Sequence, residues 1–325
     1  GQMVVVPSDG SLLVVSRGGG IKRHLPGTKS FDCMISHNQV PTSDGRKKNF
    51  GGVDIIPAAL HPDGQETIYF TYGSSVYRCP MPRLLDVGTE QVCVYAPVSE
   101  GVACFDERLS NLRLVGGVPV GASHGDTISG PVASAVSRCM YWIDCASTMS
   151  TAALIEYNTA TGVESRLCEL SGHAGDVMRG LLNKNSMAFD DVNNQALWLG
   201  NSSQDRVAKL YAFRIGVDSE PRLVTSIGGD SHHGQMSCDR HGRVFITTFC
   251  GANAGIHCYD PAKGGGFECI ISEQVKSNEM DKWYRACFAT DHFLYYSQGY
   301  RVFRVPLSNF NATPQLIGRP SKADA

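Results

Sequence analysis

One pattern recurs along the whole chain of 325 residues at intervals of about fifty. Each copy begins with small and apolar residues, passes through a polar turn into an apolar strand, and continues through a Gly/Ser/Asn turn into an alternating strand. The middles of the apolar strands are 55, 72, 57, 47 and 50 residues apart, at Val14, Tyr69, Tyr141, Trp198, Phe245 and Tyr295. Such a period indicates one supersecondary unit built repeatedly.

Each copy ends in one further run of strand-forming residues. These runs read SFDCMIS, EQVCVYAP, VESRLCEL, EPRLVTSI, FECIISEQ and TPQLIGR. Four short antiparallel strands at this period are typical of a propeller blade, whose two apolar faces are buried only when blades stack. We therefore predict an all-β, six-bladed β-propeller with four antiparallel strands per blade. The small residues of PAAL, SMAF and QMSC suit the crowded innermost strands.

The prediction is a single domain over residues 1–325. The expected blades cover approximately 1–40, 52–97, 126–172, 183–229, 233–275 and 283–319, with an insertion at 98–125. With 42% hydrophobic residues, 18% charged residues and 35 glycines, the composition excludes a disordered chain and disfavours a helical bundle. Large residues at Trp142, Trp198, Phe245 and Tyr295 are expected to fill the spaces between blades.

Charge and cysteine content limit the partners and the compartment. A net charge of -2 favours neither nucleic acid nor an anionic membrane, and no apolar run is long enough to span a bilayer. Twelve cysteines and the acceptor sequons at Asn201 and Asn311 fit a secreted protein. However, most of the cysteines lie in apolar runs, as small hydrophobic residues do, and the first residues contain no signal peptide. We expect a monomer, with a cytoplasmic location favoured over a secreted one.

Several segments resemble blades of known propellers. The run SMAFDDVNNQALWLGNSSQDRVAKLYAF resembles an NHL repeat, and MYWIDCAS resembles the YWTD blade of lipoprotein-receptor propellers. The run from Gln235, MSCDRHGRVFITTFCGANAGIHCYDPAKG, is similar to a blade of the gluconolactonase/regucalcin family. Blade by blade the resemblance spans most of the chain, and it implies a six-bladed architecture more than any one activity.

The gluconolactonase resemblance also implies a metal site. In that family one divalent cation, such as calcium or zinc, is held on the axis by a Glu, an Asn and an Asp at the starts of inner strands. The family's Asn falls on Asn185, its Asp falls on Gly234, and its Glu would lie at or before Gly1. One match in three leaves Asn185, with His233 nearby, as the candidate ligands of a single cation at the channel mouth.

Polar residues gather where the inner strands are expected to start. Since these ends converge on one mouth of the channel, we expect a ligand site there. The candidate binding residues are Asp54, Asp126, Asn185, His232, His233, Asp281 and Arg285, with Glu279 and Lys282 beside them. Adjacent residues of an extended segment point opposite ways, so only one of the two histidines can face the axis. A solvated, merely polar mouth is the simpler alternative.

Gly121–Gly125 (GASHG) matches the GxSxG pattern of α/β-hydrolases, but a propeller supplies no helix after the serine, so the match is attributed to chance. Three functions remain open. The first is a non-catalytic propeller that binds a protein or a small molecule with the channel mouth and the 98–125 loop. The second is a metal-dependent lactone or ester hydrolase. The third is an extracellular receptor propeller of the YWTD type.

Overall fold

The computed structural model describes residues 2–6, 8–16, 20–28, 31–35, 40–41, 47–48, 58–60, 67–72, 75–80, 113–117, 127–128, 131–145, 152–170, 187–201, 207–227, 233–249, 251, 253–272, 275–276 and 278–318. Apart from one 3-10 turn, η5 (Met280–Lys282), every regular element in these residues is a strand. No helix in this part of the protein is long and apolar enough to cross a membrane.

Consecutive strands form the sheets, each neighbour pair running antiparallel. The first sheet is β1 (Gln2–Val5), β2 (Leu12–Ser16), β3 (Gly20–His24) and β4 (Asp32–Ile35). The second is β7 (Ala58–Leu60), β8 (Thr67–Tyr72), β9 (Ser75–Pro80) and β10 (Arg113–Gly117), and a separate hairpin pairs β5 (Val40–Pro41) with β6 (Lys47–Lys48). The third is β11 (Thr127–Ile128), β12 (Val132–Ser134), β13 (Cys139–Cys145), β14 (Ala152–Asn158) and β15 (Glu164–Glu169).

The remaining sheets follow the same meander. The fourth is β16 (Met187–Asp190), β17 (Gln195–Asn201), β18 (Ala208–Arg214) and β19 (Arg222–Ile227). The fifth is β20 (His233–Cys238), β21 (Val244–Thr248), β22 (Gly255–Tyr259) and β23 (Glu268–Ser272). The last is β24 (Tyr284–Ala289), β25 (Phe293–Gln298), β26 (Arg301–Pro306) and β27 (Gln315–Gly318).

The protein is a β-propeller, but the prediction of six four-stranded blades is wrong in its number. Among the described residues, five sheets have four strands, whereas the third sheet has five. There, β11 pairs with the Asp144–Cys145 end of β13 and β12 pairs with its Cys139–Tyr141 end. Pro131 precedes β12, and proline has no N–H to donate to a ladder, which explains a break at this point.

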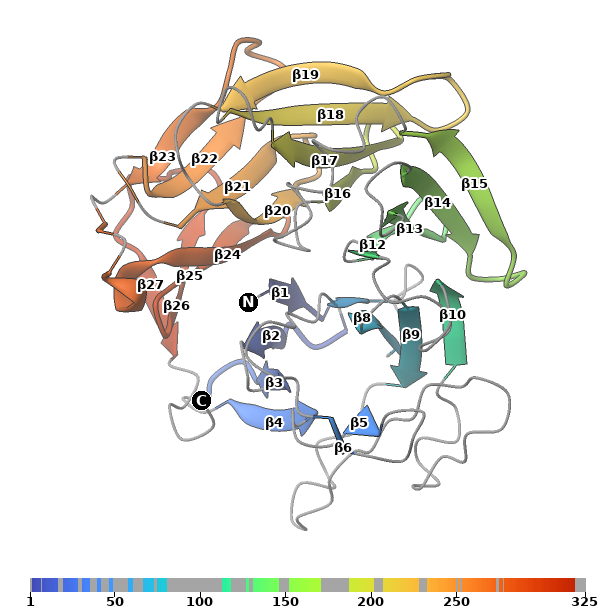
Figure 1. Ribbon diagram of the computed structural model, residues 1–325. Coiled ribbons are helices and arrows are strands. Elements are labelled where there is room, and N and C mark those ends of the chain that lie inside the picture. The colour runs from blue at the N-terminus through green and yellow to red at the C-terminus, as the bar shows by residue number, and fades with distance from the viewer. Residues whose placement is uncertain are drawn as a thin grey trace.

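One inner strand of each sheet surrounds the centre of the molecule (Figure 1). Going round, β1 contacts β7, β7 contacts β12, β12 contacts β16, β16 contacts β20, β20 contacts β24, and β24 contacts β1. The segments PAAL, SMAF and QMSC supply β7, β16 and β20, as expected for innermost strands. The inner strands therefore form a closed ring in which the starts of β20 and β24 lie side by side.

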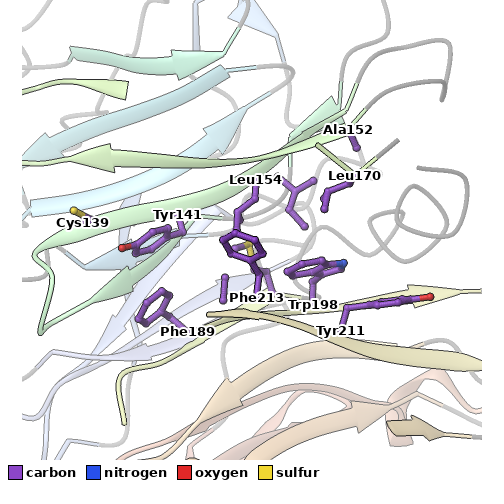
Figure 2. Packing of buried hydrophobic residues seen from close by; sticks show 12 residues of the cluster. Cys139, Tyr141, Ala152, Leu154, Leu170, Phe189, Trp198, Tyr211 and Phe213 are labelled. Atoms are coloured by element: carbon purple, nitrogen blue, oxygen red, sulfur yellow. The ribbon is translucent and has the colours of Figure 1, made fainter. Parts of the chain in front are cut away.

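Apolar side chains fill the spaces between sheets. Figure 2 shows the cluster between the third and fourth sheets, where Tyr141 stacks on Phe189 with ring centroids 4.5 Å apart and Trp198 lies on Tyr211. Trp142, Trp198 and Phe245 are fully buried, as predicted, whereas Tyr295 is only half-buried. Burial of such rings supplies most of the driving force that holds neighbouring sheets together.

The second sheet departs from the expected order of segments. Its outer strand is β10 (Arg113–Gly117), which pairs with β9 and lies inside the stretch 98–125 that we expected to be an insertion. The run EQVCVYAP, expected to form this strand, lies outside the described residues. The other five expected fourth strands coincide with β4, β15, β19, β23 and β27.

The six cysteines whose side chains are described are free thiols: Cys139, Cys168, Cys238, Cys258, Cys269 and Cys287. Burial raises the pKa of Cys168 to about 11 and that of Cys258 to about 12, and it raises the pKa of the completely buried Cys287 further. These thiols stay protonated near neutral pH, so they pack as small hydrophobic side chains.

Candidate functional site

Three of the predicted binding residues lie at the starts of β20 and β24. His233 is the first residue of β20, Arg285 is the second residue of β24, and Asp281 is in η5 just before β24. Because β20 and β24 are in contact and Gly234 packs on the carbonyl oxygen of Arg285, His233 and Arg285 lie at neighbouring strand starts. The other predicted residues, Asp54, Asp126, Asn185 and His232, lie outside the described residues.

Gly234 forms the junction between the two strands. The register of β20 against β21 shifts between His233 and Met236, which is a β-bulge. A Cβ built on Gly234 would lie 2.6 Å from Cε1 of Phe249, and closer still to Oγ1 of Thr247 and the carbonyl oxygen of Arg285. The backbone of β24 and the side chains that end β21 therefore pack directly on this glycine.

Next to Gly234, two stacked aromatic rings contact the side chain of Arg285. The rings of Phe249 and Trp283 lie 5.9 Å apart and are nearly parallel, at 17°. The guanidinium carbon of Arg285 lies 5.2 Å from the centroid of the Trp283 ring, within the range of a cation–π interaction. Trp283 and Arg285 are two residues apart in an extended segment, so they project to the same side. The positive charge of Arg285 therefore lies beside the apolar surface of the two rings.

Two buried polar atoms adjoin the stack without a hydrogen-bond partner in the described part of the protein. They are Nε1 of Trp283 and Oγ1 of Thr247, whose residue is completely buried. An unsatisfied buried donor or hydroxyl costs about 1–3 kcal/mol. His233 is 2% exposed, and its Nδ1 lies 3.4 Å from Oγ1 of Thr248.

The turn around η5 adds charge at the rim. Nζ of Lys282 donates to Oε1 of Glu279 at 3.0 Å, and the amide of Lys276 donates to the same carboxylate. The backbone amide of Lys276, followed by the ammonium of Lys282, lowers the pKa of Glu279. Asp281 is exposed, and its carbonyl oxygen lies against Gly299 of the β25–β26 turn. Asp281 is thus at the rim, whereas His233 and Arg285 lie further in.

The packing around Gly234 argues against the metal site that the gluconolactonase resemblance implies. The position of that family's Asp is Gly234, where even a Cβ has no room. The described residues also contain no group of three or more His, Cys, Asp or Glu placed to hold a metal ion. What the site offers instead is a guanidinium, two hydroxyls, an imidazole and an aromatic surface. These groups can bind a ligand through hydrogen bonds, charge and aromatic contact.

Sequence reasoning did not single out Thr247, Thr248, Phe249 or Trp283. Thr247 and Thr248 end an apolar strand and the aromatic residues flank strands, which is also the pattern of ordinary core residues. One feature of the sequence could have identified this site. Trp283 and Arg285 are two residues apart at the start of an expected inner strand, so an aromatic and a cationic side chain lie on the same face.

No protein-family model and no curated protein matches the sequence. Solved structures do match it. A chain of a nidogen/laminin complex has 13% identity, a TM-score of 0.54, and coverage of 95% of this chain and 96% of that chain. A luciferin-regenerating enzyme has 10% identity, a TM-score of 0.55, and coverage of 92% and 83%. Regucalcin from Agrobacterium tumefaciens, described as a calcium-binding protein, has 10% identity, a TM-score of 0.52, and coverage of 98% and 91%. Identities this low show the propeller fold alone.

Proposed function

We propose that this protein is a non-catalytic recognition propeller that binds its ligand at the channel mouth formed by β20 and β24. The ligand carries an acidic group next to a planar or apolar surface, as an acidic side chain of a partner protein or an aromatic carboxylate does. The proposal does not depend on the stretch 98–125, whose contribution to binding stays a prediction.

The observation that supports this proposal is the stack of Phe249 and Trp283 with the guanidinium of Arg285 beside it. A stacked guanidinium is held in one plane and presents its N–H groups in a fixed direction, which suits a carboxylate. The indole and phenyl rings provide the apolar surface beside it.

A metal-dependent lactone hydrolase is the second candidate, because regucalcin is among the solved structures with this fold. The blocked position at Gly234 argues against it. Metal analysis of the purified protein separates the two: the recognition propeller should contain no stoichiometric divalent ion. One calcium or zinc per chain, with hydrolysis of a lactone that a chelator abolishes, would instead establish the hydrolase.

Binding at the mouth can be tested with benzoate as the probe. Titration should shift the indole N–H resonance of Trp283, which is assigned by its loss in Trp283→Phe. Arg285→Lys retains the charge but loses the planar group, so affinity for benzoate should fall about tenfold. The matched control is Arg166→Lys, which alters an exposed arginine of β15 and should change nothing. A Trp283 resonance that does not respond to benzoate, or equal affinity in Arg285→Lys, would refute the proposal.

A further inference from the structure

A concave site lies at the end of the last two sheets opposite to His233 and Arg285. It is a pocket of about 800 Å³, within the size range of small-ligand sites. Its walls are the β20–β21 turn, the β22–β23 turn, the β24–β25 turn and the residues after β26. Since β20 has six residues that each rise about 3.3 Å, roughly 20 Å separates this pocket from the mouth at His233.

Arg243 is a fixed hydrogen-bond donor in the wall of this pocket. Its Nε and Nη2 each lie 2.7 Å from Oδ2 of Asp239, a carboxylate with no exposed surface. The backbone amides of His241 and Arg243 donate to the other oxygen of Asp239, which holds the carboxylate in place. The guanidinium carbon lies 5.6 Å from the ring centroid of Phe245 and 5.8 Å from that of Phe310. Arg243 is therefore oriented before any ligand arrives.

The remaining charges in the pocket are of both signs and come from different turns. Arg240 is on the β20–β21 turn, whereas Asp260 begins the β22–β23 turn and Asp291 is on the β24–β25 turn. With neutral histidines, Arg240 and Arg243 stand against Asp239, Asp260 and Asp291, which leaves a net charge of minus one. Asp260 and Asp291 would repel a simple anion, and Arg240 would repel a simple cation.

The rest of the lining is apolar or titratable. Phe293, Pro306 and Leu307 supply an apolar wall. His241 and His292 also line the pocket, but they do not join the aspartates in a metal site: no group of three or more His, Cys, Asp or Glu in the described residues is placed to hold an ion. The lining thus matches a ligand with an ammonium group, a carboxylate and an apolar body between them.

We propose that this pocket binds a short peptide with free ends. Its terminal ammonium lies between Asp260 and Asp291, its terminal carboxylate accepts hydrogen bonds from Arg240 and Arg243, and its apolar side chains rest on Phe293 and Leu307. Both ends are bound through charge-assisted hydrogen bonds, which are the stronger kind. This site is separate from the channel mouth and does not depend on the proposed function.

Calorimetric titration with the tripeptide Leu-Ala-Leu tests the proposal, with its N-acetyl and C-amide derivatives as comparisons. The free tripeptide should bind, and blocking either end should weaken binding about tenfold or more. Asp291→Asn should weaken binding of the free tripeptide but have no further effect on the N-acetyl form. Arg240→Gln should likewise weaken binding of the free tripeptide but have no further effect on the C-amide form.

Exposed charges on another sheet provide matched controls, since Arg166→Gln and Glu169→Gln on β15 should leave the affinity unchanged. Arg285→Lys at the mouth should also leave it unchanged, which separates this test from that of the proposed function. The proposal is overturned if the tripeptide does not bind, if all three peptides bind equally, or if Asp291→Asn and Arg240→Gln have no effect.

Discussion

Gly234 occupies a position where no side chain fits, because a Cβ there would meet Thr247 of β21, Phe249 just after β21, and the backbone of Arg285 in β24. Nothing in the local pattern HHGQMSC reveals this, since the neighbours come from residues 247, 249 and 285. A glycine in a strand often marks such a close approach. Here the missing side chain lets Phe249 and the backbone of β24 approach β20 closely, and Phe249 stacks on the ring of Trp283.

Gly234→Ala should destabilise the protein by about 1–3 kcal/mol, because the added methyl group forces the backbone of β24 or the side chain of Phe249 to move. Urea denaturation measures the change in the free energy of unfolding. The control is Gly266→Ala, where the nearest atom to the new Cβ is 3.7 Å away and the change should be within about 0.5 kcal/mol. Equal effects of the two substitutions would contradict the packing at Gly234.

His257 links stability to pH. It is 5% exposed, its Nε2 lies 2.9 Å from the carbonyl oxygen of Asn253, and burial lowers its pKa. A carbonyl only accepts, so Nε2 carries a hydrogen, and the lowered pKa keeps the ring neutral near neutral pH. The folded protein binds fewer protons here than the unfolded chain, whose histidine titrates near about 6.5. This contribution to stability is therefore complete above that pH and decreases as the pH falls through it towards the lower folded value.

The melting temperature of the wild type should fall between pH 7.5 and pH 5, and His257→Gln should show a smaller fall over the same range. His292→Gln, which replaces an exposed histidine, is the control and should keep the wild-type difference. An unchanged pH dependence in His257→Gln would show that protonation of this ring does not limit stability.

At the scale of elements, β17 shows how one strand serves two interfaces. Trp198 points into the cluster shared with the third sheet, whereas Leu197 and Leu199 point into the cluster shared with the fifth sheet. Successive side chains of a strand alternate, so a sheet buried on both faces needs a continuous apolar run such as ALWLG.

Trp198→Ala should cost about 3–5 kcal/mol, because the cavity opens beneath Tyr211 between two sheets. Trp198→Phe should cost less than about 2 kcal/mol: it keeps most of the ring and removes a buried Nε1–H that has no partner among the described residues. Guanidinium denaturation of both variants checks the order. A phenylalanine variant as unstable as the alanine variant would contradict it.

Periodicity predicted most of the strands because each is short, apolar and bounded by turns, and five of the six expected fourth strands are present. The exception is β10, where two strand-like runs follow β9 and either could pair with its free edge. Gly116 and Gly117 also weaken the strand signal of the run that does pair. For the mouth, the starts of inner strands indicated His233 and Arg285, but Trp283 and Phe249 resemble core residues until the neighbouring sheet is known.

At the scale of the whole molecule, the ring is closed by side chains. Within the described strands, the first sheet uses only residues 2–35 and the last only residues 284–318, so neither end donates a strand to the other. Met3, Leu12 and Val14 pack on Ala286 and Val302 across this boundary. Beside it, Gln235 of β20 accepts a hydrogen bond from the amide of Met3 at 2.7 Å and donates one to its carbonyl at 2.8 Å.

Gln235→Leu should leave both peptide groups of Met3 buried without partners, at about 1–3 kcal/mol each. Hydrogen exchange of the Met3 amide should become faster than that of β17 amides, and the free energy of unfolding should decrease. Gln315→Leu removes a hydrogen bond to the exposed face of Arg304 and should change stability by less than about 0.5 kcal/mol. Unchanged exchange at Met3 in Gln235→Leu would show that the packing alone closes the ring.

The closure by side chains has a mechanical consequence. When tension is applied between residues 2 and 318, no ladder of backbone hydrogen bonds resists separation of β1 from β24. The circle can part along this seam and spread into an arc while every sheet keeps its own strands. Under load, the protein would thus lengthen first by opening, before any strand is pulled out of its sheet.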